Sequence, residues 1–256
     1  MNQQDVVKMK RKNKKKAKKI IMLIFLVLIA LGLLFTLSVT VFFPVKSVEI
    51  EGNSYYTSEE IKKAVDINKK DNLLIINEEK VLNDLQKQLP FVDDIKINKK
   101  LPGAVKITVT EAKEKYCYKI GDIYYSADKN NRVLGEYNDK PSELIFVEIN
   151  AEIVGEQIKT VQMPNKNTDE IFKTLQTAMD SFSYKVDYID ISNLQDIKIG
   201  VEDRFTIEIG SSVYIEDKIN LLREMLKTKG ENDSGTFVLD KWSPENPTAS
   251  YFKSAS

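Results

Sequence analysis

Histidine is absent from the 256 residues of this chain, and cysteine occurs only once, as Cys117. A Ser–His–Asp triad, a Cys–His nucleophile and a zinc site of histidine or paired cysteine ligands are therefore impossible within the chain. An internal disulfide is excluded as well. Cys117 stands between two tyrosines in a strand-like stretch, and we expect it to be a small strand residue that is buried or half-buried. Any chemistry would have to rely on carboxylates, lysines or serines.

Motifs for such chemistry are incomplete. The S-x-x-K pattern of penicillin-recognising enzymes occurs at residues 126–129 and 250–253, but neither copy is followed by S-D-N or K-T-G. Asp128 begins a stretch similar to a calcium-binding loop, yet Arg132 and Val133 occupy the places of a ligand and of the turn glycine. A phosphate loop and a G-x-G-x-x-G pattern are also missing. We therefore predict no catalytic, cofactor-binding or metal-binding residues.

One long hydrophobic run lies near the start of the chain, at residues 20–43, and none of its 24 residues is charged. At about 1.5 Å per residue, a helix of this length spans roughly 36 Å, whereas the hydrocarbon core of a bilayer measures about 30 Å. A cleaved signal peptide has a shorter apolar region and a small-residue cleavage site, which the end of this run does not provide. We predict an uncleaved helix that crosses the membrane once.

The charges on the two sides of this run are of opposite sign. Residues 1–19 carry nine lysines and arginines against one acid, a net charge of +8, and residues 20–256 carry −8 because the whole chain is neutral. The positive-inside rule places the tail in the cytoplasm and residues 44–256 outside. A basic run can also bind nucleic acid, but next to a membrane helix we favour attraction to anionic lipid. An exported segment with one cysteine fits a bacterial surface.

The first exported stretch, residues 44–111, predicts the element order β-α-α-β-β. A strand at residues 45–51 precedes a capping box at Thr57–Glu60, which begins a short helix. Asn77 can cap a second helix with one apolar face. Two alternating strands then follow, joined by a turn at Leu101–Gly103. These elements predict a three-stranded sheet with two helices packed on one face.

This stretch resembles the POTRA domain of the FtsQ/DivIB family of cell division proteins. The motifs follow the order found in the family: FPVKSVEIEGN at 43–53, PFV at 90–92, KKLP at 99–102 and VKITVTE at 105–111. The single apolar anchor with a basic tail is also similar to the family. The resemblance is strong over residues 20–111 and rests on the general pattern beyond them.

Residues 112–242 predict a second domain that is rich in strands, as the resemblance implies. A hairpin at residues 116–125 leads to a turn and strand at 128–134, where Asn131 stands in the place of the usual glycine. Asparagine tolerates the left-handed conformation, so this departure is mild. Strands are further predicted near residues 144–149, 186–191, 197–201, 204–209, 236–240 and 248–252, and helices from about residue 168 and around 215–226, with Gly230 at the end of the second.

The predicted fold class is therefore α+β, with a single transmembrane helix, a POTRA domain (β-α-α-β-β) and a second, β-rich α+β domain. The predicted boundaries are a basic cytoplasmic tail at 1–19, a transmembrane helix at 20–43, a POTRA domain at 44–111, a β-rich FtsQ/DivIB-type domain at 112–242 and a C-terminal partner-binding strand or tail at 243–256.

The resemblance implies a non-catalytic scaffold of the bacterial division machinery, located in the cell membrane at the septum. It implies FtsL-type and FtsB/DivIC-type proteins as partners, together with a septal peptidoglycan synthase complex. A membrane-anchored cell-wall enzyme is one alternative, against which the missing catalytic motifs argue. A POTRA-type polypeptide receptor in transport is another, and the chain has no sequence for an outer-membrane barrel.

The end of the chain is the predicted partner site. An exposed sheet edge presents unpaired N–H and C=O groups, to which another chain can add a strand. A late strand followed by a short aromatic segment has the arrangement of such an edge, and the resemblance implies that partners bind there. Two aromatic residues would serve as anchors, unless they close the domain's own core or end as a frayed terminus. The predicted partner-binding residues are Phe237, Leu239, Thr248, Ser250, Tyr251 and Phe252.

Overall fold

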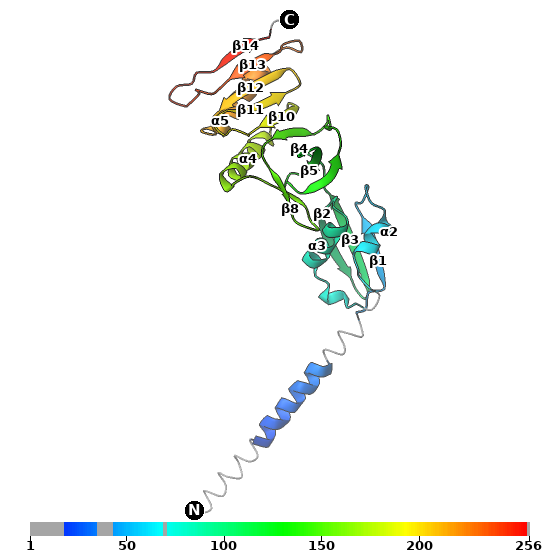
Figure 1. Ribbon diagram of the computed structural model, residues 1–256. Helices are drawn as coiled ribbons and strands as arrows, with labels where there is room; N and C mark the ends of the chain where they lie inside the picture. The colour runs from blue at the N-terminus through cyan, green and yellow to red at the C-terminus, as the bar shows by residue number, and fades with distance from the viewer. Residues whose placement is uncertain (1–17, 35–42, 69–70, 255–256) are drawn as a thin grey trace, which may run out of the picture. The chain divides into compact units, whose positions relative to one another are not determined.

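The computed structural model describes residues 18–34, 43–68 and 71–254 (Figure 1). The chain divides into two compact units, which are described separately. The first contains Met1–Leu85 and Asp94–Glu111, and the second contains Gln86–Asp93 and Ala112–Ser256.

Residues 18–34 form a helix whose large hydrophobic side chains are exposed. Within the described ranges, no helix has both the length and the apolar character that a membrane crossing requires. The predicted spanning helix at residues 20–43 includes residues 35–42, which lie outside the described residues, as do residues 1–17 of the basic tail.

The first unit contains the predicted β-α-α-β-β order. Its three strands form a sheet in the order β1-β3-β2, and β1 and β3 run parallel, with Ser47 opposite Ala104. The sheet therefore has β1 at one edge. The elements, some of which extend into residues 86–93, are β1 (Ser47–Glu51), α2 (Ser58–Ala64), the 3-10 turn η1 (Leu73–Ile75), α3 (Glu78–Gln88), β2 (Val92–Lys100) and β3 (Ala104–Glu111).

Both helices of this unit begin at the predicted caps. The Thr57 hydroxyl accepts a hydrogen bond from the Glu60 N–H at 3.2 Å, and the Glu60 carboxylate accepts one from the Thr57 N–H at 2.8 Å. The hydrogen bond from the Thr57 side chain, followed by the one from its backbone, lowers the pKa of Glu60. Asn77 accepts from the Lys80 N–H at 3.0 Å. These caps satisfy N–H groups that have no partner within the helix.

Alternate side chains along β3 are buried, so one face of the small sheet lies against the core. The alternation of apolar and polar residues in the sequence predicted this arrangement. The helices contribute buried side chains to the same unit, and Leu85 of α3 is completely inaccessible to solvent. The buried hydrophobic residues of this unit include Val45, Ile61, Leu73, Val81, Leu85, Ile95, Val105, Ile107 and Val109.

The second unit is organised around one nine-stranded mixed sheet in the order β14-β13-β12-β11-β10-β7-β4-β5-β6. The last strand, β14, is therefore part of the domain's own sheet. A separate hairpin joins β8 and β9 and was not predicted from the sequence. The elements are β4 (Tyr116–Ile120), β5 (Ile123–Ala127), β6 (Val133–Tyr137), β7 (Ile145–Glu148), β8 (Glu152–Val154), β9 (Thr160–Gln162), α4 (Lys166–Met179), β10 (Val186–Asp190), β11 (Ile197–Val201), β12 (Phe205–Gly210), α5 (Ile215–Lys227), β13 (Gly235–Val238) and β14 (Ser250–Lys253).

Helices α4 and α5 pack against this sheet, and together they form the main hydrophobic core of the second unit (Figure 1). Phe172 and Leu175 of α4 and Leu222 of α5 are fully buried in the same cluster as the inward residues of β10 to β13.

Helix α5 ends at Lys227, three residues before the glycine expected to end it, and the Thr228 N–H closes its last turn. Asn131 has φ of 63°, which confirms the left-handed position, and its side chain accepts from the Tyr118 hydroxyl at 2.6 Å.

Cys117 lies in β4 with no solvent exposure, as predicted. Burial raises the pKa of its thiol to about 11. Two nearby charges have smaller effects: Lys140 lowers this pKa and Glu114 raises it. Because the thiolate is the reactive form, only about one thiol in a thousand is reactive at pH 8. We expect iodoacetamide to modify the folded chain far more slowly than the urea-denatured chain at the same pH, as measured by mass spectrometry. Equal rates would place Cys117 at the surface.

Candidate protein-binding edge

The last strand of the chain is the edge of the nine-stranded sheet. β14 pairs antiparallel with β13, and the register sets Ser250 opposite Val238 and Lys253 opposite Gly235. No further strand follows β14 in the described sheet. Its outer side therefore presents backbone groups to which another extended chain can be added.

Alternation along β14 places two neighbouring aromatic rings on opposite faces. Tyr251 packs on the core side, where its ring centroid lies 4.8 Å from that of Phe237. Its hydroxyl donates to the Ser234 carbonyl at 2.9 Å, and the Lys229 ammonium lies 3.7 Å from its ring centroid. These contacts fasten β14 to the domain.

Phe252 lies on the other face of the sheet and is 62% exposed. Its carbonyl points toward β13, because a Cβ placed on Gly235 would lie only 2.1 Å from the Phe252 oxygen. Backbone groups alternate in direction along a strand, so the N–H and C=O groups of Tyr251 and Lys253 point to the open side. The edge thus offers main-chain donors and acceptors beside one exposed aromatic ring.

An ion pair holds the end of β14. The Lys253 ammonium lies 3.1 Å from the Asp233 carboxylate, and the Asp233 carboxylate also accepts from the Gly230 N–H at 2.9 Å. The Gly230 N–H, followed by Lys253, lowers the pKa of Asp233. Sequence reasoning did not find Lys229 or Asp233, because only the folded chain brings them beside residues some twenty positions later.

The six predicted partner-binding residues do not share one surface. Phe237 of β13 and Leu239, which directly follows β13, have no solvent exposure because both pack in the hydrophobic core of the second unit. Tyr251 and Ser250 are half-buried, whereas Thr248 and Phe252 are exposed. Thr248 bonds locally, from its hydroxyl to the Asn246 side chain at 2.8 Å. A partner can therefore reach the exposed residues and the outer backbone of β14, while the two core residues act only by supporting the edge.

The structure assigns both S-x-x-K segments to strands or turns. Ser126 is fully buried in β5 and donates a hydrogen bond to the Glu114 carboxylate, whereas Lys129 lies in the following turn and is exposed. Ser250 and Lys253 are both in β14. In penicillin-recognising enzymes the serine acts as a nucleophile beside the lysine, an arrangement that neither segment provides.

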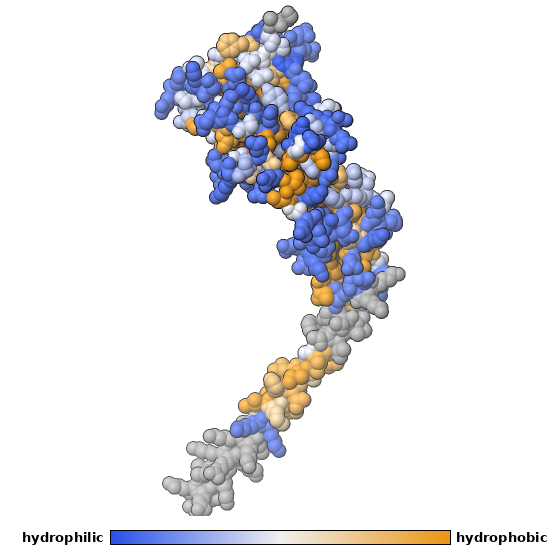
Figure 2. Space-filling view, in the orientation of Figure 1, coloured by the Kyte–Doolittle hydropathy of each residue, from blue (hydrophilic) through white to orange (hydrophobic). Residues whose placement is uncertain are grey.

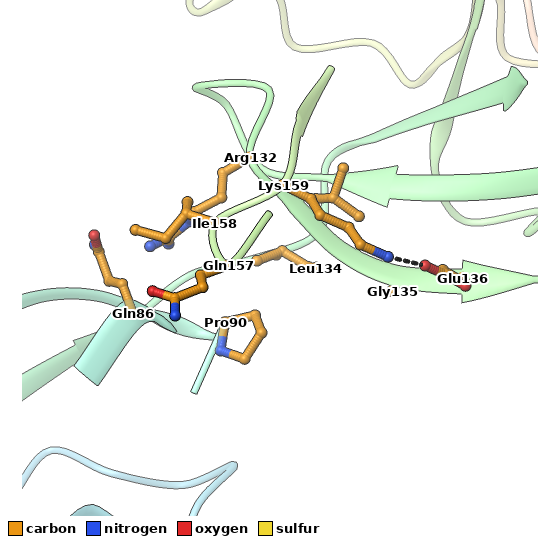
Figure 3. A pocket seen from close by; sticks show the side chains of 10 residues that line it. Gln86, Pro90, Arg132, Leu134, Gly135, Glu136, Gln157, Ile158 and Lys159 are labelled. Carbon is orange, nitrogen blue, oxygen red and sulfur yellow. Dashed lines mark hydrogen bonds and ion pairs between the residues drawn. The ribbon is translucent and has the colours of Figure 1, made fainter. Parts of the chain in front are cut away.

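A cavity of about 200 Å³ lies beside β6 in the second unit (Figure 3). At its rim, Lys159 and Glu136 form an ion pair at 2.8 Å with both side chains about half exposed. Arg132 is engaged elsewhere, donating to the Val92 carbonyl at 2.7 Å. The lining residues are Gln86, Pro90, Arg132, Val133, Leu134, Gly135, Glu136, Gln157, Ile158 and Lys159, and they include no nucleophile paired with a base.

Comparison with known proteins agrees with this architecture. The family model described as "POTRA domain, FtsQ-type" matches residues 43–112, which include β1 to β3. A "Cell division protein DivIB" of Clostridium botulinum (strain Hall) is 27% identical over 241 residues, covering 87% of this chain and 86% of that protein. A protein of the same name from Clostridium tetani is 27% identical over 195 residues, covering 74% and 72%. The chain thus contains a POTRA domain of the FtsQ type, and relatives named Cell division protein DivIB match most of its length, which supports the FtsQ/DivIB family of cell division proteins.

Proposed function

We propose that this chain is a non-catalytic scaffold of the bacterial division machinery. Residues 20–43 anchor it in the cell membrane, with the N-terminus in the cytoplasm and the two folded units outside. The uncharged run and the +8 tail support this anchor and orientation. The names of the relatives support a role in cell division. At the septum, the chain holds FtsL-type and FtsB/DivIC-type partners and, through them, the septal peptidoglycan synthase complex.

The observation that carries this proposal is the free edge of β14 with the exposed Phe252 beside it. An extended segment of the FtsB/DivIC-type partner adds to the sheet outside β14. The outward backbone groups of Tyr251 and Lys253 set its register, and the ring of Phe252 supplies buried apolar area. Tyr251 keeps its own ring in the core and holds the edge in place.

Two point variants test this edge. Phe252→Asp removes the exposed anchor, and aromatic hot spots are worth about 2 kcal/mol or more, so partner affinity should fall by roughly 30-fold or more. Lys253→Pro removes an outward N–H while leaving the bonds to β13, and should also weaken capture. Affinity of the full chain in nanodiscs for its FtsB/DivIC-type partner would be measured by biolayer interferometry.

Val213→Asp is the matched control, because Val213 is 57% exposed in the same unit but lies outside the edge. It should bind the partner normally. Phe252→Asp and Val213→Asp should keep the melting temperature of the parent chain, whereas Lys253→Pro also breaks the exposed pair with Asp233 and should lower the melting temperature slightly. Unchanged affinity in both edge variants would move the site elsewhere. Deleting residues 247–256 is less informative, because it also removes the packing of Tyr251 against the core.

A further inference from the structure

Two loops of the first unit flank the residue at which the apolar run ends. The Phe43 carbonyl accepts from the Leu73 N–H at 2.8 Å, and the Val45 N–H donates to the Asp71 carbonyl at 2.9 Å. On the other side, the Lys46 N–H donates to the Gly103 carbonyl at 2.7 Å. The chain therefore enters this unit between η1 and the turn that joins β2 to β3.

The exposed aliphatic side chains of this unit lie on these two loops. Leu74, Ile75 and Leu101 are 43%, 75% and 63% exposed. Among the described residues 43–68 and 71–111, the remaining exposed large hydrophobic residue is Tyr55, whose N–H bonds to the Glu111 carboxylate at the opposite end of β3. A single exposed leucine is ordinary, but three aliphatic side chains at one end form a patch. Figure 2 shows hydrophobic surface at this end of the unit, near the start of β1 in Figure 1.

Hydrogen bonds hold the patch in a defined shape. The Lys99 ammonium donates to the carbonyls of Leu74 and Ile76 at 3.0 and 2.9 Å, and so joins η1 to β2. Asn72 caps η1 by accepting from the Leu74 N–H at 2.8 Å. Ile75 is thus presented outward by a fixed turn. Lys99 and Lys100 are exposed and directly precede Leu101.

We propose that this membrane-facing patch, defined as Leu74, Ile75 and Leu101 with Lys99 and Lys100, rests on the outer surface of the lipid bilayer. The inference depends on the proposed anchor at residues 20–43. Because the last residue of that run bonds directly to η1, no spacer separates the anchor from the patch. Aliphatic tips beside lysines suit the boundary between acyl chains and headgroups, where apolar groups insert and ammonium groups remain in the polar layer.

Contact with lipid gives the POTRA domain a second attachment besides its covalent link. One attachment leaves the domain free to rotate about the connection, whereas two loops on the surface restrict its tilt. The proposal therefore makes the patch a positioning device for the folded units above the membrane.

Spin labels can test the contact in the full chain incorporated in nanodiscs of phosphatidylcholine and phosphatidylglycerol. In a Cys117→Ala background, one label is placed by Ile75→Cys and a matched control by Tyr55→Cys, at the other end of the same domain. We expect the label at 75 to collide several-fold more with lipid-soluble oxygen than with an aqueous nickel chelate, relative to the label at 55. Melting temperatures equal to that of the parent chain establish that both variants are folded.

Flotation of the chain with vesicles of the same lipids tests the anchor separately. A chain that fails to float overturns the anchor and, with it, the lipid contact. A chain that floats, but whose label at 75 is as accessible to nickel chelate as the label at 55, overturns the lipid contact alone. Shielding of the label at 75 only after a partner protein is added would assign the patch to that protein and also overturn the proposal.

Discussion

Replacing Leu85 by aspartate is expected to unfold the POTRA domain. Leu85 has no solvent exposure and lies on the packed face of α3. Truncating a buried leucine to alanine already costs about 2–5 kcal/mol, and an unpaired charge in its place adds the cost of removing that charge from water. Domains are stable by only about 5–15 kcal/mol, so this loss is large enough to unfold a small unit.

Circular dichroism and thermal denaturation of the full chain would measure the loss of this domain. Asn83→Asp provides the control, because it adds the same charge at an exposed position of the same helix. The control should melt within a degree or two of the parent chain. A Leu85→Asp chain with an unchanged spectrum and melting temperature would show that α3 does not pack through this face.

Replacing Arg132 by alanine should lower the free energy of unfolding of the second unit by about 3–5 kcal/mol, the usual cost of leaving a buried charge without its partner. Arg132 and Asp128 are only 8% and 3% exposed. The Arg132 Nε lies 3.3 Å from Asp128 Oδ2, an ion-pair contact without hydrogen-bond geometry, and its Nη2 lies 3.6 Å from Asp93 Oδ1. The variant leaves the buried Asp128 carboxylate without a neighbouring cation, and among the described residues only the backbone N–H groups of residues 130 and 132 still donate to it.

Urea denaturation of the full chain would measure this change. Combining Asp128→Asn with Arg132→Met removes both charges, and we expect it to recover more than half of the loss, because a buried pair is often replaceable by neutral groups. Lys159→Ala is the control, since it breaks an exposed pair worth about 1 kcal/mol or less. A loss in Arg132→Ala no greater than that of the control would show that the buried pair does not stabilise the unit.

Local patterns in the sequence predicted the elements well, because their causes are local. The Thr57 capping box, the Asn77 cap and the left-handed Asn131 each depend on residues within a few positions. The alternation of buried and less buried residues along β3 is likewise local, because it depends only on one strand that has one face toward the core. The β8–β9 hairpin was missed because its two strands have only three residues each, too few for a clear alternation.

The candidate site could be predicted only in part. The sequence shows a late strand with a following aromatic segment, and the family resemblance implies that partners bind at this end. Four of the six predicted residues proved at least partly accessible, whereas Phe237 and Leu239 are buried. The contribution of Lys229 to the edge had no signal in the sequence, because its ring contact with Tyr251 joins residues 22 positions apart.

The sequence by itself determined the exclusion of histidine and disulfide chemistry, the apolar run with its basic tail, and the order of helices and strands apart from the β8–β9 hairpin. Composition, hydropathy and capping depend on residue types and near neighbours, which the sequence states directly. Only the tertiary structure decided which strand is the edge and which aromatic ring faces out. Tyr251 and Phe252 are adjacent and similar in size, yet one is held in the core and the other is exposed. That difference arises from the pairing of β14 with β13, which is set by long-range packing across the sheet.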